Sequence, residues 1–201
     1  MISKILLDKK AVHLSPDNFF TWASGLKSPI YCDNRKIISA PRERDIIVNE
    51  FVKMINLKYP TTEIIAGTAT AGIPWAAWIA DKMQKPMIYI RSSNKSHGLK
   101  NAIEGDMPNG SKVLVIEDLI STGGSSLKAC EEVKNAGGEV LCVASIFSYN
   151  LKKAHDSFQA AEIKYFSLDN LKNLLAYTKK EQLLDEKQIG IIEQWKKEHL
   201  S

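Results

Sequence analysis

Two adjacent carboxylates in the middle of the chain stand directly before a run of hydroxyl groups and glycines. Glu117 and Asp118 follow the apolar residues 113–116, and the run after them contains Ser121, Thr122, Gly123, Gly124 and Ser125. Glycines let the backbone bring its N–H groups close to an anion, and hydroxyl groups and the N-terminus of a following helix add further donors. Two carboxylates beside such a socket suit the vicinal hydroxyls of a sugar, if needed with a divalent ion. The segment therefore predicts a site for ribose 5-phosphate.

A structural interpretation of the same segment is also open. Glu117 and Asp118 would then form a solvated turn, and Ser121 and Thr122 would only cap the next helix. The coincidence of an acidic pair, a hydroxyl–glycine loop and a strand-to-helix position favours a binding site. Other nucleotide motifs are missing from the sequence: residues 67–72 have the glycine spacing of a Walker loop but continue without Lys-Ser or Lys-Thr, and no GxGxxG occurs.

A polar, basic loop follows the apolar residues 87–90. It carries Arg91, Lys95 and His97 and has little apolar surface to bury, which predicts a mobile lid near the phosphate socket. Arg91 can bind two oxygens at once, Lys95 supplies a point charge, and His97 can neutralise or protonate a leaving group. Taken alone, such a loop is more often a solvated segment without a ligand.

Around these segments, helical patterns alternate with short apolar strands. Helices are predicted over 42–57, 74–83, 125–135 and 181–199, and a further one after residue 169. Pro41 lies near the start of the first helix, Gly137-Gly138 stop the third, and Asp169 is expected to cap the helix that follows it. Strands are predicted over 63–66, 87–90, 112–116, 140–147 and 163–166. This alternation predicts a parallel sheet covered on both faces, with ligands at the carboxyl ends of the strands. The first forty residues break the pattern and predict a separate cap or hood.

The composition excludes several classes of protein. The chain has 201 residues, 44% hydrophobic and 25% charged, as in one soluble globular domain. No apolar run reaches the roughly 20 residues of a membrane span, and residues 1–8 become charged too early for a signal peptide. Three widely spaced cysteines predict neither a disulfide framework nor a zinc site and fit a reducing cytoplasm. The net charge of +4 suits a small anionic substrate and is too low to predict nucleic-acid binding.

The segment from Val113 to Ser126 closely resembles the phosphoribosyl pyrophosphate (PRPP) signature of type I phosphoribosyltransferases. The resemblance implies that the two acids hold the ribose 2′- and 3′-hydroxyls and that the following loop holds the 5′-phosphate. The implied PRPP site comprises Glu117, Asp118, Leu119, Ile120, Ser121, Thr122, Gly123, Gly124, Ser125 and Lys27. The implied fold is α/β: a central, mainly parallel sheet flanked by helices, with a small N-terminal hood and a mobile catalytic loop. One domain over 1–201 would have its hood in about 1–40, its core in 41–170 and C-terminal helices in 171–201.

Three further segments resemble orotate phosphoribosyltransferases. The pattern from Arg91 through Lys95 to His97-Gly98, followed by Ile-Glu-Gly, resembles their catalytic loop, which closes over the neighbouring subunit's active site and so implies a homodimer. Residues 19–35 can form a hairpin whose Phe and Trp pack into the core. Within them, residues 24–31 resemble the segment in which Lys27 reaches the substrates and Tyr31 and Cys32 border the base. Ser121 is the best candidate for a direct contact with orotate. Residues 67–74 resemble the loop that touches pyrophosphate through its backbone.

The resemblance implies that N1 of orotate displaces pyrophosphate from C1 of PRPP, giving orotidine 5′-phosphate in pyrimidine (UMP) biosynthesis, with Mg²⁺ held mainly by PRPP near the acidic pair. Some positions depart from family members: Ser92 and Ala71 stand where some carry Lys, and residues 148–150 replace an Asp-Arg that grips the base. One alternative is a phosphoribosyltransferase acting on a purine or uracil. Another is a PRPP-sensing regulator that binds nucleic acid, although too few residues precede Phe19 for a helix-turn-helix module.

Overall fold

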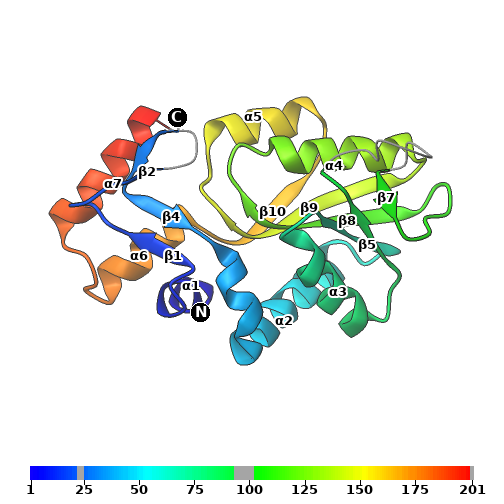
Figure 1. The fold of residues 1–201 in the computed structure, drawn as a ribbon, viewed down its shortest axis with the longest axis horizontal. Helices are drawn as coiled ribbons and strands as arrows, with labels where there is room; N and C mark the ends of the chain where they lie inside the picture. Colours follow the sequence, from blue (N-terminus) through cyan, green and yellow to red (C-terminus); the bar gives the residue numbers. More distant parts are fainter. Residues whose placement is uncertain (22–24, 93–101, 200–201) are drawn as a thin grey trace.

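The computed structural model describes residues 1–21, 25–92 and 102–199, and a six-stranded sheet forms its centre (Figure 1). The strand order is β10-β9-β8-β5-β6-β7, and all neighbours are parallel except β6 and β7. The strands are β5 (Ile64–Thr68), β6 (Met87–Ile90), β7 (Ile103–Glu104), β8 (Lys112–Ile120), β9 (Glu139–Ser148) and β10 (Tyr165–Asn170). Helices α2 (Pro41–Lys58) and α3 (Gly72–Met83) cover one face, and α4 (Gly124–Asn135) and α5 (Lys152–Ala160) cover the other. The predicted α/β sheet flanked by helices is confirmed.

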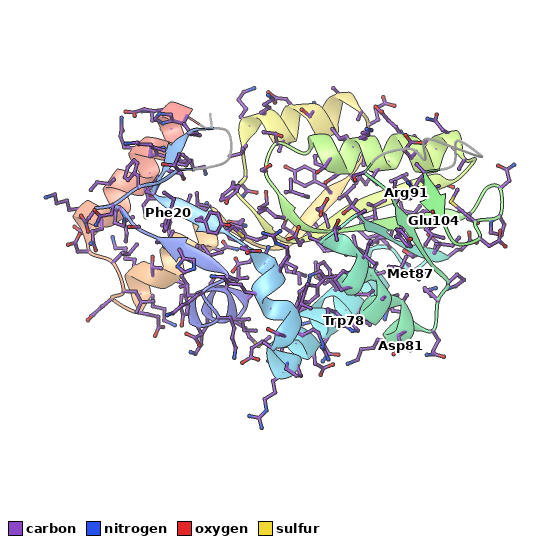
Figure 2. All side chains as sticks on the ribbon, viewed as in Figure 1. Phe20, Trp78, Asp81, Met87, Arg91 and Glu104 are labelled. Carbon is purple, nitrogen blue, oxygen red and sulfur yellow. The ribbon has the colours of Figure 1, made fainter. Side chains whose placement is uncertain are left out.

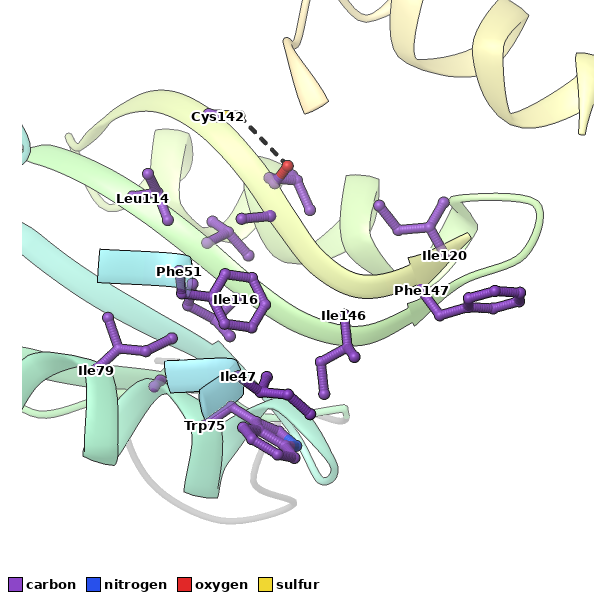
Figure 3. Close-up of a cluster of buried hydrophobic side chains, with 14 of the residues drawn as sticks. Ile47, Phe51, Trp75, Ile79, Leu114, Ile116, Ile120, Cys142, Ile146 and Phe147 are labelled. Carbon is purple, nitrogen blue, oxygen red and sulfur yellow. Dashed lines mark hydrogen bonds between the residues drawn. The ribbon is translucent and has the colours of Figure 1, made fainter. Parts of the chain in front are cut away.

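The core lies between the sheet and the helices on either side. Figure 3 shows the ring of Phe51 of α2 beside Ile116 of β8, with Trp75 of α3 in the same cluster, and all three side chains are fully buried. Burying a large apolar side chain contributes about 1.5–3 kcal/mol. The central strands are therefore held firmly, and the polar residues at their carboxyl ends have a rigid support.

Strand β8 is longer than its apolar run predicts. The expected strand over 112–116 continues to Ile120, because Glu117, Leu119 and Ile120 pair with β9 in parallel register. The acidic pair therefore belongs to the strand itself, and the loop begins only after Ile120.

Three other boundaries near the C-terminal end of the chain also differ from prediction. Strand β10 begins at Tyr165, and Asn170, not Asp169, caps α6 (Leu171–Lys180) by accepting a hydrogen bond from the Asn173 N–H at 3.0 Å. The Asp169 carboxylate instead accepts a hydrogen bond from the hydroxyl of Ser3. The last helix, α7 (Glu186–His199), begins later than the predicted start at 181.

The elements of the first forty residues gather beyond one edge of the sheet, as predicted for a hood. They are α1 (Ile2–Asp8), β1 (Val12–Leu14), β2 (Phe20–Thr21), β3 (Lys27–Ser28), β4 (Ile30–Cys32) and the 3₁₀ helix η1 (Asn34–Ser39), with β1 paired to β4 and β2 paired to β3. Helices α6 and α7 lie beside them (Figure 1). Trp195 Nε1 of α7 donates to the Lys27 carbonyl at 2.7 Å, and Gln188 Nε2 donates to the Asp17 carboxylate at 2.9 Å. Both ends of the chain thus build this layer.

Among the described residues, no helix combines the length and the apolar character that crossing a membrane requires.

Candidate functional site

The candidate site lies where strand order reverses in the sheet. Strand β5 has β6 on one side and β8 on the other, and crevices at such switch points are where open α/β sheets bind ligands. The hydroxyl of Thr68, at the end of β5, donates to the Ile116 carbonyl of β8 at 3.0 Å. A Cβ on Gly72 would lie 2.3 Å from that same oxygen, so the loop between β5 and α3 packs closely against β8 only because residue 72 is glycine.

The acidic pair lies at this switch point, with Glu117 buried and Asp118 half-buried. Glu117 is only 7% exposed, and its Oε1 accepts a hydrogen bond from the Asp118 N–H at 3.1 Å. Burial raises the pKa of Glu117 to about 8, with the negative charge of Asp118 adding to the effect. Burial also raises the pKa of Asp118, and the positive charge of Arg35 partly opposes that shift. The negative charges of these two carboxylates are only partly offset by the protein. A ligand that brings hydrogen-bond donors, or a cation, would therefore bind favourably between them.

The acidic pair determines how stability should depend on pH. With the Glu117 pKa raised to about 8, the folded chain keeps a proton that the unfolded chain releases near its ordinary pKa of about 4.5. The free energy of unfolding should therefore be highest below that value and fall as the pH rises toward about 8. Urea unfolding across this range should give a steeper decline for the wild type than for Glu117→Gln. Parallel curves for the two proteins would contradict the raised pKa.

The loop after β8 ends in a helix start that no side chain caps. Gly123, with φ of +83°, precedes the first residue of α4 as its N-cap, and among the described residues no side-chain capping hydrogen bond is made there. The interpretation of Ser121 and Thr122 as mere helix caps is therefore wrong. Ser126, in the first turn, has a buried hydroxyl without a hydrogen-bond partner among the described residues. Free N–H groups at a helix N-terminus attract an anion, so this turn can hold a phosphate.

Gly123 should be hard to replace. Its backbone is in the left-handed region, and a Cβ there would lie 2.8 Å from Cε2 of Phe158. Gly123→Val should therefore lower the free energy of unfolding by roughly 2 kcal/mol or more, from backbone strain and overpacking. Gly124→Ala is the matched control, because a Cβ there has no heavy atom within 4 Å. Equal denaturation midpoints for the two variants would rule out this explanation.

A small cavity of about 100 Å³ adjoins this loop, at the ends of β5 and β6. Its lining residues are Thr68, Ala69, Ile90, Arg91, Ser92, Ser125, Lys128, Ala129 and Glu132. Arg91, predicted as a catalytic-loop residue, makes an ion pair with Glu104 at 3.5 Å from Nη1 to Oε1, and both are labelled in Figure 2. The predicted catalytic residues Lys95 and His97 lie outside the described residues. Arg91 and Ser125, from segments far apart in sequence, thus meet at one cavity.

Apart from Ser121, which follows β8, the predicted base-binding residues come from the hood. The Cys32 thiol donates to Asn34 Oδ1 at 3.4 Å, and burial, with the nearby charges of Asp118 and Asp33, raises its pKa. The Tyr31 ring packs against Phe20 at 5.9 Å between centroids and is 37% exposed. Successive strand residues point to opposite faces, so of this pair Cys32 is the one whose side chain turns toward the acidic pair.

Lys27, the third predicted residue of the hood, has an exposed side chain, while its backbone carbonyl is bound by Trp195. Leu119 and Ile120 lie at the end of β8, where the Ile120 side chain is fully buried. Ile120 can therefore contribute to a PRPP site only through its backbone.

Two residues that the sequence analysis did not select join the hood to the sheet. Asn34 Nδ2 donates to the Asp118 carbonyl at 2.7 Å. The buried Tyr149 hydroxyl, after β9, lies against the backbone N–H of Cys32, and burial raises the pKa of this phenol. Neither residue carries a local signal, because each matters only through a partner distant in sequence. Thr68 is different, because a polar residue at the end of an apolar strand is a local sequence signal from which its place at the site could have been predicted.

Comparison with known proteins agrees with this geometry. The profile of a family described as the phosphoribosyl transferase domain matches residues 35–173. The curated orotate phosphoribosyltransferase of Staphylococcus aureus (strain Mu50) is 49% identical over 195 residues, 97% of this chain and 96% of the relative. That of Fusobacterium nucleatum is 52% identical over 197 residues, 97% and 93% of the two chains. A crystal structure of orotate phosphoribosyltransferase from Aeropyrum pernix aligns with a TM-score of 0.78 at 26% identity, over 92% of this chain and 100% of that one.

The sheet, the acidic pair at the end of β8 and the glycine turn before α4 are those of a phosphoribosyltransferase, and the family match covers most of the chain. The chain is thus an enzyme of that class. Within the class, it belongs to the orotate phosphoribosyltransferase family. Its relatives in that family are about 50% identical to it, and the match covers nearly the whole length of each. The family expected from the sequence is confirmed.

Proposed function

We propose that the protein joins PRPP and orotate at the switch point between β5 and β8, releasing pyrophosphate and orotidine 5′-phosphate. The observation that carries this proposal is the acidic pair, with Glu117 buried and Asp118 half-buried, a short glycine loop before the N-terminus of α4. The carboxylates accept hydrogen bonds from the ribose 2′- and 3′-hydroxyls. Ser121, Thr122 and the first-turn N–H groups of α4 donate to the 5′-phosphate.

The reaction develops positive charge on the ribose ring while pyrophosphate leaves with its negative charge. No nucleophilic side chain is needed, so the chain contributes by positioning and by electrostatics. Arg91, with Lys95 and His97 as predicted from the resemblance, binds and neutralises the leaving pyrophosphate. Lys27, Tyr31, Cys32 and Ser121 hold orotate so that N1 faces C1. Closure of the loop keeps water from the reacting carbon.

The acidic pair also fits Mg²⁺ as a cofactor. No group of three or more His, Cys, Asp or Glu residues suitable for a metal occurs in the described part of the chain. A pair of carboxylates is nevertheless what Mg²⁺ uses, since it usually binds one or two carboxylates together with substrate phosphates and water. Glu117 and Asp118 would hold it together with PRPP, and the ion would offset the charge of pyrophosphate.

The remaining parts of the proposal concern assembly and location. Resemblance of the loop from Arg91 to His97 to the family's catalytic loop supports a homodimer whose subunits share their active sites. The place of the reaction would be UMP biosynthesis in the cytoplasm, where the free thiols of Cys130 and Cys142 are expected to stay reduced.

An ultraviolet assay tests the proposed function. Orotate absorbance should fall when the wild-type protein is mixed with orotate, PRPP and Mg²⁺, and it should not fall when PRPP is left out. Hypoxanthine and uracil serve as alternative bases in parallel reactions. Consumption of either of these, with orotate untouched, would reject the substrate assignment while keeping the class of reaction.

A further inference from the structure

One face of α4 points into the cavity of about 100 Å³ described above. Ser125, Lys128, Ala129 and Glu132 all line it, with the spacing of residues that share a helix face. The opposite walls come from Thr68-Ala69 after β5 and from Arg91-Ser92 after β6. The cavity therefore lies between the predicted pyrophosphate loop, the base of the predicted catalytic loop and the last residue of the phosphate loop.

The charges around this cavity are not equally available. Arg91 is engaged with Glu104. Lys128 has an exposed side chain and forms no ion pair with any residue in the described ranges. Ser92 and Ala69 line the walls opposite α4 and carry no charge. Among the lining residues, Lys128 is therefore the cation that has no ion-pair partner in the described part of the chain.

We propose that Lys128 binds the pyrophosphate group of PRPP from within its own subunit. This role rests on the proposed function, and it is separate from that of the loop carrying Lys95, which acts on the neighbouring subunit. The ammonium group of Lys128 approaches from α4, opposite the backbone of Ala69, and offsets charge that Ser92 and Ala71 do not. Glu132, one turn further along the helix on the same wall, acts against the anion.

The experiment measures binding directly. Titration calorimetry gives the dissociation constants of pyrophosphate and of PRPP, each with Mg²⁺, and kinetics give the KM for orotate. Lys128→Ala should weaken binding of both ligands about tenfold, the effect of losing one charge-assisted hydrogen bond. The KM for orotate should stay within about twofold, since the base lies on the hood side of the site. Lys128→Arg should restore most of the affinity.

Two matched variants separate this role from a structural one. Lys134→Ala, in the last turn of the same helix, removes an identical charge outside the cavity and should leave both constants unchanged. Glu132→Gln should tighten pyrophosphate binding about twofold. Equal effects of the two lysine variants, or unchanged pyrophosphate affinity in Lys128→Ala, would overturn the proposal. Because binding is measured without turnover, a wild-type protein that binds pyrophosphate but ignores orotate would refute the proposed function and leave the role of Lys128 standing.

Discussion

Glu117→Gln is expected to lower kcat/KM by about 10²-fold or more while leaving the protein at least as stable as the wild type. The amide keeps the shape of the side chain and loses the charge that strengthens hydrogen bonds to the ribose hydroxyls and attracts Mg²⁺. Stability should not suffer, because burial and the neighbouring Asp118 already raise the pKa of Glu117 to about 8. Below that pH the folded protein without ligand already holds Glu117 protonated and neutral, so the neutral amide of glutamine can replace it without loss of stability.

Steady-state kinetics with varied PRPP and thermal unfolding without ligand measure the two effects. Glu139→Gln, at the exposed start of β9, removes the same charge far from the switch point and should change neither. Loss of activity accompanied by a lower Tm would mean that Glu117 supports the fold and does not bind substrate. Full activity of Glu117→Gln would reject the proposed sugar site itself.

Lys95→Ala should lower kcat by about 10²- to 10³-fold, the usual cost of removing one group that stabilises transition-state charge. The wild-type fold should persist, since the loop has little apolar surface to bury. The stronger test uses two inactive proteins together. If the loop acts on the neighbouring subunit, co-expressed Lys95→Ala and Glu117→Gln chains should regain roughly a quarter of wild-type activity, because random pairing makes half the dimers mixed and each has one intact site.

The control pairs Lys95→Ala with His97→Ala, two variants of the same loop that cannot complement each other. Activity should stay at the level of the single variants. If the mixture of Lys95→Ala and Glu117→Gln shows no recovery either, the loop acts within its own subunit or the chain is not a dimer. Recovery in both mixtures would point to subunit-independent residual activity instead of shared sites.

Much of the sheet could be predicted from the sequence because its strands are continuous apolar runs with polar ends. The acidic pair and the glycine turn could also be predicted, because the residues that form the phosphate and ribose site are neighbours in the sequence. The end of β8 was missed because residues 117–120 become strand through pairing with β9, which no local pattern reveals. Asp169 was a reasonable cap by residue type, yet the Ser3 hydroxyl engages it and Asn170 caps the helix.

The contacts between hood and sheet were beyond sequence reasoning of this kind. Asn34 binds the carbonyl of Asp118, which lies 84 positions further along the chain, and Tyr149 contacts Cys32 only after the sheet and hood have formed. Nothing in the sequence distinguishes Lys128 from other surface lysines, and only the structure shows that it lines the cavity next to α4. Roles of this kind depend on contacts between residues that are far apart in the sequence, and the spacing of residues within one segment does not reveal them.

The bond from Trp195 Nε1 to the Lys27 carbonyl has a consequence for the order of events during synthesis. The sheet residues emerge from the ribosome well before residue 195, so the socket for sugar phosphate can assemble while translation continues. The strand that bears Lys27 acquires this support only later. The hood strand with Lys27 should consequently reach its final position only after the sheet and the phosphate loop have formed.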